Sequence, residues 1–437
     1  MSAAPARVDG IEQLLRGDFP DPDGGGAIAI PIKSIVIADT LRGAEADVVR
    51  PLALGQRLAV VSDPATHGVL GARVESALSA IATIVPVRLQ FRPHADARTA
   101  AAVRRACESV DALVAVGSGT INDLCKYAAA KDGKPYVVFA TAPSMNGYTS
   151  MNAAITVDGH KRSLGAKTPV GVFIDLQVLA NAPARMIRAG LGDSLCRPTA
   201  QADWLLSHYL LGTPYRSAPF CLLAADEAKL FDASEELLAG DLEAMRALAR
   251  TLVLSGLGMT ICGGSYPASQ GEHLISHYID MCSPPGRADY FHGEQVAVAT
   301  LTMASIQQRM LAAGPPALEP PAVTELDLCQ RLGPELGPSC WREFLPKRAL
   351  AEAAATISGH ARDSWADLQK RVGAAAVAAD RLARIMARAE GPTTPTDIGL
   401  GHAFYARAVR DARFLRDRYT FLDLADDCGC LDRWWPV

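Results

Sequence analysis

The sequence predicts an N-terminal α/β domain with a parallel sheet, followed by an all-α C-terminal domain. Up to about residue 180, short runs rich in valine and isoleucine alternate with helical runs, as in sheets that helices cover on both faces. Beyond that point, long segments rich in alanine and leucine dominate, and strand signals almost vanish. We therefore expect a flexible N-terminal segment over residues 1–27, an α/β domain over 28–181 and a helical domain over 182–437.

Six strands are expected in the α/β domain: Ser34–Ala38, Arg57–Ser62, Val85–Phe91, Ala112–Val116, Tyr136–Ala140 and Val170–Ile174. Helical runs such as Ala97–Ser109 and Ile121–Lys131 lie between them. In the second domain we expect helices over Gly192–Leu211, Ala218–Ala239, Asp241–Thr260 and Glu294–Ala313, with a proline-rich break at Gly314–Pro321.

The composition is that of a globular protein and excludes several classes. Of the 437 residues 49% are hydrophobic, and the net charge of -4 lacks the basic footprint of a nucleic-acid binder. No apolar run reaches the roughly 18 residues that a membrane span needs. The N-terminus lacks the charge and apolar pattern of a secretory signal. The ten cysteines are scattered, so we expect free thiols in a cytoplasmic protein.

The segment from Ala112 to Asp123 has the pattern of a phosphate-binding loop. A buried strand runs into Gly117-Ser118-Gly119-Thr120-Ile121-Asn122-Asp123, and a helical run follows. Glycines let the backbone approach a pyrophosphate, and the first N–H groups of a helix have no partner within it. The motif departs from the full G-x-G-x-x-G pattern, so an ordinary strand-to-helix turn is the alternative. We expect a Rossmann-like site for NAD or NADP.

Two further segments that follow strands are candidates for the same cofactor. Asp63 ends the strand Arg57–Ser62, where an acid can accept hydrogen bonds from an adenosine ribose and favour NAD. However, Asp63 precedes Pro64, and Asp-Pro commonly starts a turn. The polar loop Thr141–Ser150 follows another strand, which is where α/β folds bind ligands. Its serines and threonines could equally be ordinary loop residues.

Three of the nine histidines lie within twenty residues of one another and predict a metal site. His273 and His277 are four residues apart, which places them on one face of a helix. His292 stands at the start of the next helix, and an antiparallel arrangement would bring it back towards His273.

A metal site built on two histidines needs a further ligand, for which a carboxylate is suitable. Spacing alone does not choose among Asp193, Asp203 and Asp280. Asp193 follows Gly190-Leu191-Gly192 and precedes a helix, so it could also be a simple N-cap.

Together these motifs resemble those of the sn-glycerol-1-phosphate dehydrogenases, within the superfamily of iron-type alcohol dehydrogenases and dehydroquinate synthase. The match extends over about residues 30 to 310. The segments that carry it are Gly117–Asp123, Thr141–Ser144 with Gly147, Gly192-Asp193-Ser194, Gly271–His277 and His292–Val296. The resemblance implies a dehydroquinate synthase-like fold, with a nucleotide-binding first domain and a metal- and substrate-binding second domain.

The resemblance also implies roles for individual residues. Asp193, His273 and His292 would hold one divalent metal, with zinc expected and nickel or iron as alternatives. Asp193 and His277 would be catalytic and would contact substrate. Asn146 would contact substrate without a catalytic role. The residues that would bind the cofactor are Gly117, Ser118, Gly119, Thr120, Asn122, Asp123, Thr141 and Ser144, with Ser150 at the nicotinamide.

The chain departs from the family pattern at two places. The family has an acid at the position of Asn146, and an amide both donates and accepts where a carboxylate only accepts. Cys196-Arg197-Pro198 stands where relatives carry lysine and tyrosine, so the phosphate pocket is in question. Other candidates for phosphate contact are Lys161, Arg162 and Lys167, although a solvated hairpin is the simpler interpretation of the first two.

The resemblance implies an NAD(P)-dependent oxidoreductase of phospholipid metabolism that interconverts dihydroxyacetone phosphate and sn-glycerol 1-phosphate or a related polyol phosphate. We expect a homo-oligomer. Two alternatives stay open at this point. One is a sugar-phosphate cyclase of the dehydroquinate synthase type, which recycles its NAD within each turnover. The other is a catalytically weak NAD-binding homologue, which the changes at Asn146, Arg197 and Pro198 would favour.

Overall fold

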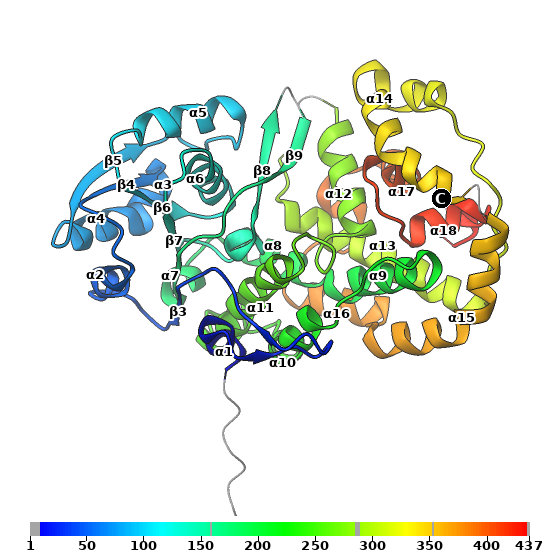
Figure 1. The fold of residues 1–437 in the computed structure, drawn as a ribbon, viewed down its shortest axis with the longest axis horizontal. Helices are drawn as coiled ribbons and strands as arrows, with labels where there is room; N and C mark the ends of the chain where they lie inside the picture. The colour runs from blue at the N-terminus through cyan, green and yellow to red at the C-terminus, as the bar shows by residue number, and fades with distance from the viewer. Residues whose placement is uncertain (1–8, 158–159, 285–288, 352–353, 435–437) are drawn as a thin grey trace, which may run out of the picture. The chain divides into compact units, whose positions relative to one another are not determined.

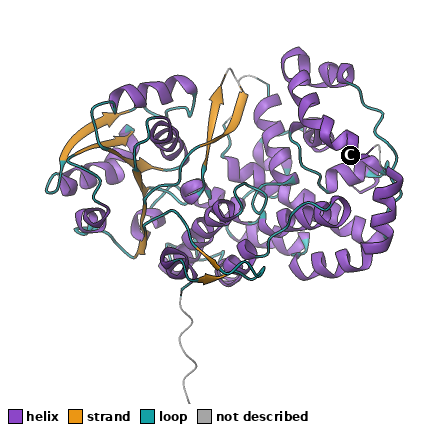
Figure 2. Cartoon of the chain, in the orientation of Figure 1, coloured by secondary structure: helices purple, strands orange, loops and turns teal. Residues whose placement is uncertain are grey.

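The computed structural model describes residues 9–157, 160–284, 289–351 and 354–434. The chain divides into two compact units. Unit 1 holds the residues up to Gly190 together with Arg216–Ser265, and unit 2 holds Leu191–Tyr215 and the chain from Tyr266 onward. Strands occur in unit 1, whereas the described secondary structure of unit 2 is helical (Figures 1 and 2).

Unit 1 is built on a six-stranded parallel sheet in the order β3-β10-β7-β6-β4-β5. The strands are β3 Ser34–Ala38, β4 Arg57–Ser62, β5 Thr83–Arg88, β6 Ala112–Gly117, β7 Tyr136–Ala140 and β10 Gly171–Asp175. Every residue of β6, β7 and β10 is buried, which explains their runs of valine, isoleucine and phenylalanine. The predicted parallel α/β sheet is confirmed.

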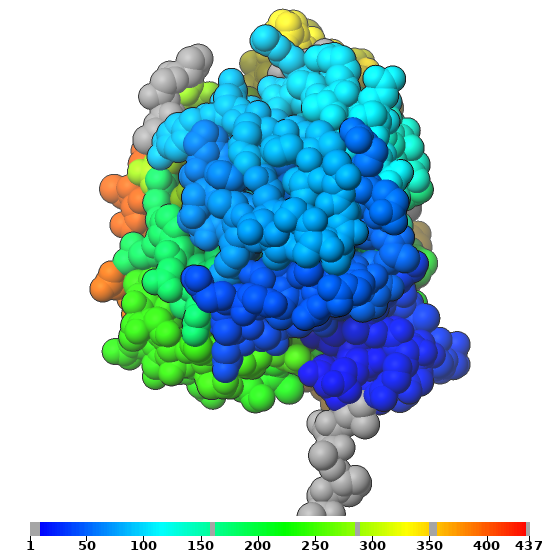
Figure 3. All heavy atoms as spheres, turned by 90° about the vertical axis from the view of Figure 1, so that its left-hand side faces the viewer, coloured from blue at the N-terminus to red at the C-terminus, as the bar shows by residue number. Residues whose placement is uncertain are grey.

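The helices of unit 1 cover both faces of this sheet. Side chains of α2 Glu45–Val49 and α4 Ala72–Leu78 pack on the face that carries Leu58, Val60 and Val114. Helix α6 Gly119–Lys131 follows β6 directly and packs against it, with α5 Ala97–Ala106 beside α6. Figure 3 shows one face of unit 1, formed largely by the blue and light-blue atoms of its N-terminal part.

The predicted strand Val85–Phe91 is shifted in the structure. β5 runs over Thr83–Arg88, and residues 89–91 lie beyond its end. Among the described strands β5 lies at the edge of the sheet and pairs with β4 alone, so it tolerates Pro86, which lacks a backbone donor. Its partly exposed residues lack the continuous buried pattern of the central strands, which is why its start was misplaced.

The segment expected to be a flexible lead-in contains regular structure where it is described. Helix α1 Gly10–Arg16 begins at Asp9, whose side chain accepts from the N–H of Ile11. β1 Phe19–Pro20 then pairs with β2 Ala27–Ile28. The carboxylates of Asp21 and Asp23 bond to Arg216 and Ser217 of the same unit. Residues 1–8 lie outside the described residues.

A hairpin of β8 Asn152–Val157 and β9 His160–Gly165 follows the polar loop and the short turn η3 Gly147–Thr149. Arg162 and Lys167 are exposed, as the interpretation of a solvated hairpin expected for Arg162. The side chain of Lys161 lies outside the described residues. Helices α7 Leu176–Ala180, α10 Ala218–Asp232 and α11 Leu242–Ile261 complete unit 1, with α10 packed on α11.

Unit 2 is a bundle of helices around one hydrophobic core, which Leu206, Ile275, Met303 and Phe414 help to form. Helix α8 Ala184–Ser194 crosses from unit 1 into unit 2. The other helices that matter below are α9 Arg197–Leu211, α12 Gly271–Cys282, α13 His292–Ala313, α15 Ala354–Ala375, η5 Ala412–Leu415 and α18 Phe421–Asp427. In the described part of the chain, no helix is both long and apolar enough to cross a membrane.

The expected domain boundaries stay a prediction. The expected helical domain began at residue 182. In the structure, however, the segment Arg216–Ser265, which includes α10 and α11, belongs to the compact unit 1. These two helices were predicted at nearly the right positions. Their association with unit 1 was not expected.

Candidate metal centre and cofactor loops

The glycine loop between β6 and α6 has the geometry of an anion-binding turn. Ser118 stands at the N-cap of α6 but gives no side-chain cap, so the first N–H groups of this helix stay available. A Cβ on Gly117 would lie 2.6 Å from the Cβ of Ile121, so the turn requires glycine there. Asn122 is buried, and its Oδ1 finds no partner within the described residues.

The polar loop after β7 lies directly beside the glycine loop. The backbone N–H of Thr141 donates to the carbonyl of Gly117 at 3.2 Å, because β6 and β7 are neighbouring strands. Thr141, Ser144 and Ser150 are all buried. The structure therefore brings most of the predicted cofactor residues together at the carboxyl edge of the sheet, as parallel strands require.

Asp63 lies at the end of β4, the strand next to β6. Its Oδ1 accepts from the N–H of Thr66 at 2.8 Å, and its own N–H donates to Thr66 Oγ1. This capping box starts the short helix α3 Pro64–Thr66. The turn-starting role that the sequence offered as the alternative is therefore present, and a ribose contact stays a prediction.

Lys126 is a feature of this site that the sequence interpretation missed. Its side chain is fully buried, and Nζ donates to the carbonyls of Gly147 at 2.6 Å and Asn152 at 2.9 Å. Asp123 lies 3.6 Å away, and its Oδ2 accepts from the N–H of Ala154. Burial lowers the pKa of Lys126. The lysine thus ties α6 to the polar loop, and a lysine within an apolar helical run was the available signal.

Asn146 lies in the same loop, against α11. Its Nδ2 donates to Ser255 Oγ at 3.2 Å. The loop is packed tightly on α11, because a Cβ on Gly256 would lie 2.2 Å from Thr149 Oγ1 and 2.5 Å from the carbonyl oxygen of Asn146. The amide therefore uses a donor that an ionised carboxylate at this position would not have.

In unit 2, the structure brings Asp193, His273 and His292 together. One ligand atom from each lies within 4.8 Å of the others. Asp193 comes from the last turn of α8, His273 from the first turn of α12 and His292 from the first residue of α13. The rings of His273 and His292 have centroids 5.0 Å apart, and α12 packs against α13 as the sequence interpretation anticipated.

Glu272 orients His273 within this cluster. Its fully buried Oε1 lies 2.9 Å from His273 Nδ1, while His273 Nε2 lies 3.6 Å from Asp193 Oδ1. Burial works to lower the pKa of His273, but the bonds to Asp193 and Glu272 outweigh it and raise the pKa. A carboxylate on Nδ1 leaves Nε2 as the ligand atom, as in many metal sites. Sequence reasoning did not single out Glu272.

A second chain of hydrogen bonds orients His292. Ser276 Oγ lies 3.1 Å from His292 Nδ1 and donates to Gln295 Oε1 at 2.9 Å. Gln295 Nε2 in turn donates to Asp280 Oδ1 at 2.9 Å. Since the hydroxyl proton points to Gln295, Ser276 accepts from Nδ1–H, and His292 Nε2 is left for a ligand.

The two other carboxylates that spacing left open have different roles. Asp203 caps α12 by accepting from Gly271 N at 2.9 Å, and it also accepts from Phe421 N at 3.0 Å. Burial and nearby Glu272 raise the pKa of Asp203 to about 8. Asp280 belongs to the bonds that reach Ser276 through Gln295. Of the three, Asp193 is the carboxylate that lies with the two histidines.

Cys196, Glu272 and His273 form a second cluster of possible ligands. The thiol of Cys196, however, donates to the carbonyl of Asp193 at 3.1 Å. Glu272 is also occupied, because it accepts from the N–H of Gln270 at 2.8 Å as well as from His273. We therefore interpret Cys196 and Glu272 as residues that position the ligands of the first cluster, and not as ligands of a second metal.

The donor set of Asp193, His273 and His292 fits a divalent cation. Two imidazoles with orienting partners and one buried carboxylate are the ligands that zinc, nickel and ferrous iron take in proteins. His277 lies beside the cluster, with its ring centroid 6.3 Å from that of His273 and 6.1 Å from that of His292. It is partly exposed, which suits a group that contacts substrate.

Comparison with known proteins gives a consistent result. Residues 36–183 match the family model "Iron-containing alcohol dehydrogenase". Glycerol-1-phosphate dehydrogenase [NAD(P)+] of Bacillus subtilis (strain 168) is 30% identical over 411 residues, covering 92% of this chain and 93% of that protein. The protein of that name from Thermococcus sibiricus is 30% identical, covering 75% of this chain and 96% of its own.

The chain belongs to the glycerol-1-phosphate dehydrogenase family. It is an oxidoreductase of the group that acts on CH–OH with a nicotinamide cofactor.

Solved structures support the fold. Glycerol dehydrogenase from Schizosaccharomyces pombe has a TM-score of 0.61 at 17% identity, over 92% of this chain and 89% of that one. Sulfoacetaldehyde reductase from Bifidobacterium kashiwanohense has a TM-score of 0.59 at 16% identity, over 93% and 96%. The predicted fold, an α/β domain with a helical part of the dehydroquinate synthase-like type, is confirmed.

Proposed function

We propose that this family member interconverts dihydroxyacetone phosphate and sn-glycerol 1-phosphate, or a closely related polyol phosphate, with NAD(H) or NADP(H) and one divalent metal. The cluster of Asp193, His273 and His292 carries the proposal, because hydrogen bonds at both Nδ1 atoms leave Nε2 for a ligand. The relatives named glycerol-1-phosphate dehydrogenase [NAD(P)+] support the substrate and the cofactor.

When bound, the metal would supply a Lewis acid for the C2 oxygen, and the reduced nicotinamide would supply hydride. The residues of the chain bind the metal and the cofactor and transfer the proton. Asp193, His273 and His292 would hold the metal at the place where the reacting end of the substrate binds. His277 passes a proton through water to the C2 oxygen as the alcohol forms. The N–H groups at the start of α6 bind the cofactor pyrophosphate, and Lys126 fixes the loop that carries Ser150.

Net production or consumption of NADH separates this function from the cyclase alternative. A dehydrogenase changes the absorbance of reduced nicotinamide in proportion to substrate, whereas a cyclase restores its cofactor in each turnover. The first substrate to test is dihydroxyacetone phosphate, with NADH and with NADPH. NAD binding without turnover of any polyol or polyol phosphate by metal-loaded protein would instead favour the weak homologue.

The metal ligands are tested by His292→Ala. This variant should lose both bound metal and activity, because the remaining carboxylate and imidazole bind a divalent cation far more weakly than three ligands do. Metal content is measured on purified protein by elemental analysis. A variant that kept the metal stoichiometry of the wild type would show that the ligand assignment is wrong. His208→Ala is a control, because His208 lies in α9 and its Nδ1 contacts the carbonyl of Thr213.

A further inference from the structure

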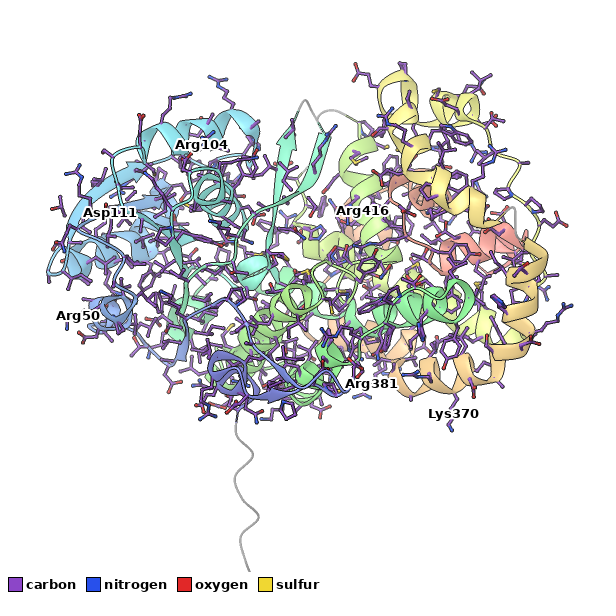
Figure 4. All side chains as sticks on the ribbon, viewed as in Figure 1. Arg50, Arg104, Asp111, Lys370, Arg381 and Arg416 are labelled. Atoms are coloured by element: carbon purple, nitrogen blue, oxygen red, sulfur yellow. The ribbon has the colours of Figure 1, made fainter. Side chains whose placement is uncertain are left out.

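Two arginines follow η5 in unit 2 and lie beside α12. Helix η5 packs against α12, and Figure 4 labels Arg416 among the helices of this unit. The guanidinium of Arg418 donates to the carbonyl of Ser269, just before α12 begins, and lies over the ring of Tyr266 at 4.5 Å. The pair therefore lies next to the helix that carries His273 and His277.

Arg416 is a largely buried cation without a counterion in contact. Within the described part of the chain its guanidinium makes no hydrogen bond and no ion pair, and Glu343 acts on it only at a distance. Burial lowers the pKa of Arg416. Burial and the neighbouring Arg416 lower the pKa of Arg418 to about 10. Two adjacent cations in a poorly hydrated place favour binding of an anion.

The nearby cations Arg413 and Lys347 differ from Arg416, because carboxylates neutralise them. Arg413 bonds to Asp423, Asp426 and Asp427. Lys347 donates to Asp423 at 2.9 Å and also to the carbonyl of Arg418 at 3.1 Å. These contacts fix the backbone of the segment around Arg418, so the nearby Arg416 is held in place without a carboxylate in contact.

This place is connected to the candidate metal centre through a short path. Arg418 bonds to Ser269, whose neighbour Gln270 donates its N–H to Glu272 Oε1, the atom that contacts His273 Nδ1. Arg197, where the sequence departs from the expected family pattern, bonds to Gln201 Oε1 at 2.7 Å. The arginine pair is thus better placed than Arg197 to receive an anion.

We propose that Arg416 and Arg418 form an anion site that binds the phosphate group of the polyol phosphate. The identity of that ligand rests on the proposed function, but the anion site itself does not. Two guanidinium groups can bind a phosphate through several charge-assisted hydrogen bonds. The pair would place the phosphate of a short substrate near the metal centre and discriminate against unphosphorylated polyols.

The first test measures binding of inorganic phosphate to the full-length, metal-loaded protein by calorimetry, with saturating NAD to fill the glycine loop. Arg416→Gln should weaken phosphate binding by about 10- to 100-fold, as expected for loss of charged hydrogen bonds. Arg416→Lys keeps the charge and should be intermediate. Arg362→Gln removes an exposed arginine of α15 and should bind as the wild type does. Unchanged phosphate binding by Arg416→Gln would overturn the proposal.

The second test compares substrates. Arg416→Gln should raise KM for dihydroxyacetone phosphate by about 10- to 100-fold and leave kcat/KM for dihydroxyacetone unchanged. Melting curves without phosphate establish that each variant is folded. A loss that is equal for both substrates would contradict a phosphate role.

The two proposals can fail separately. If the wild type binds phosphate through Arg416 but turns over no polyol phosphate, the result supports the anion site and contradicts the proposed function. If the wild type turns over dihydroxyacetone phosphate and Arg416→Gln does so with the same KM, the reverse holds.

Discussion

At the scale of single residues, the candidate metal centre depends on which nitrogen of each histidine faces a ligand. The two histidines are oriented by different partners. Glu272 accepts from His273 with a buried charge, whereas a neutral serine contacts His292. A carboxylate raises the basicity of its imidazole more than a hydroxyl does. The weaker of the two supports is therefore Ser276, and removing it tests the arrangement without removing a ligand.

We expect Ser276→Ala to weaken metal binding by about 10- to 100-fold, as loss of an outer partner of a metal-bound histidine commonly does. Without the hydroxyl, His292 Nδ1 loses its partner and the ring can rotate. The affinity is measured by competition with a chelator. Ser207→Ala is the matched control, because Ser207 is a buried serine of the same unit whose hydroxyl, among the described residues, donates to the carbonyl of Trp204 and contacts no proposed ligand. Equal affinities of the two variants would count against the proposed orientation.

Some site residues could be predicted from neighbouring residues in the sequence, whereas others depend on how distant segments pack. His273 and His277 could be predicted to share one helix face because they are four residues apart, and His292 could be added because it starts the next helix. Asp193 could not be chosen by spacing, because its distance to them depends on how α8 packs. Arg416 was not singled out, since an arginine near aspartates along the chain is commonly paired. Only the packed structure shows that the nearby aspartates are bound to Arg413.

At the scale of elements, a close approach of two helices brings the cluster together. Gly192 of α8 faces Gly293 of α13, and a Cβ on Gly192 would lie 2.2 Å from the carbonyl oxygen of Gly293 and 2.9 Å from Ala297 Cβ. Each glycine directly neighbours a proposed ligand, Asp193 in one helix and His292 in the other. The separation of the two ligands therefore depends on the absence of a side chain at Gly192.

We expect Gly192→Ala to destabilise the protein by about 1–3 kcal/mol, the usual cost of inserting a methyl group into a packed contact. It should also weaken metal binding, because α8 must move away from α13. Urea unfolding and metal titration measure the two effects. The control is Gly373→Ala in α15, where a Cβ meets nothing within 4 Å and should be neutral or slightly stabilising. Normal metal affinity in a destabilised Gly192→Ala would show that the contact supports the fold alone.

The elements themselves were largely predictable, and the exceptions have physical causes. The strands buried on both faces were predicted to within one residue, because a continuous apolar run bounded by turns is an unambiguous signal. The edge strand β5 was shifted, since one neighbour and partial exposure leave a weaker pattern. Helices α10 and α11 were predicted as helices, but an apolar helix face does not say which partner covers it.

At the scale of the whole molecule, the candidate cofactor loops and the candidate metal centre belong to different compact units. The glycine loop and the polar loop lie in unit 1, while Asp193, His273 and His292 lie in unit 2. A ligand that binds only the folded form of one unit stabilises that unit by mass action. The two ligands should therefore affect unfolding in different ways.

We expect calorimetric unfolding to show two transitions, each raised by a different ligand. NAD should raise the transition of unit 1, and zinc that of unit 2, by about 2.7 kcal/mol when the free ligand is at 100 times its Kd. A chelator should lower only the second transition. In His292→Ala the shift with zinc should vanish while the shift with NAD persists, since the substitution leaves unit 1 unchanged. If zinc and NAD instead raised one common transition in the wild type, the two units would unfold as one, and the division into units would describe packing but not cooperativity.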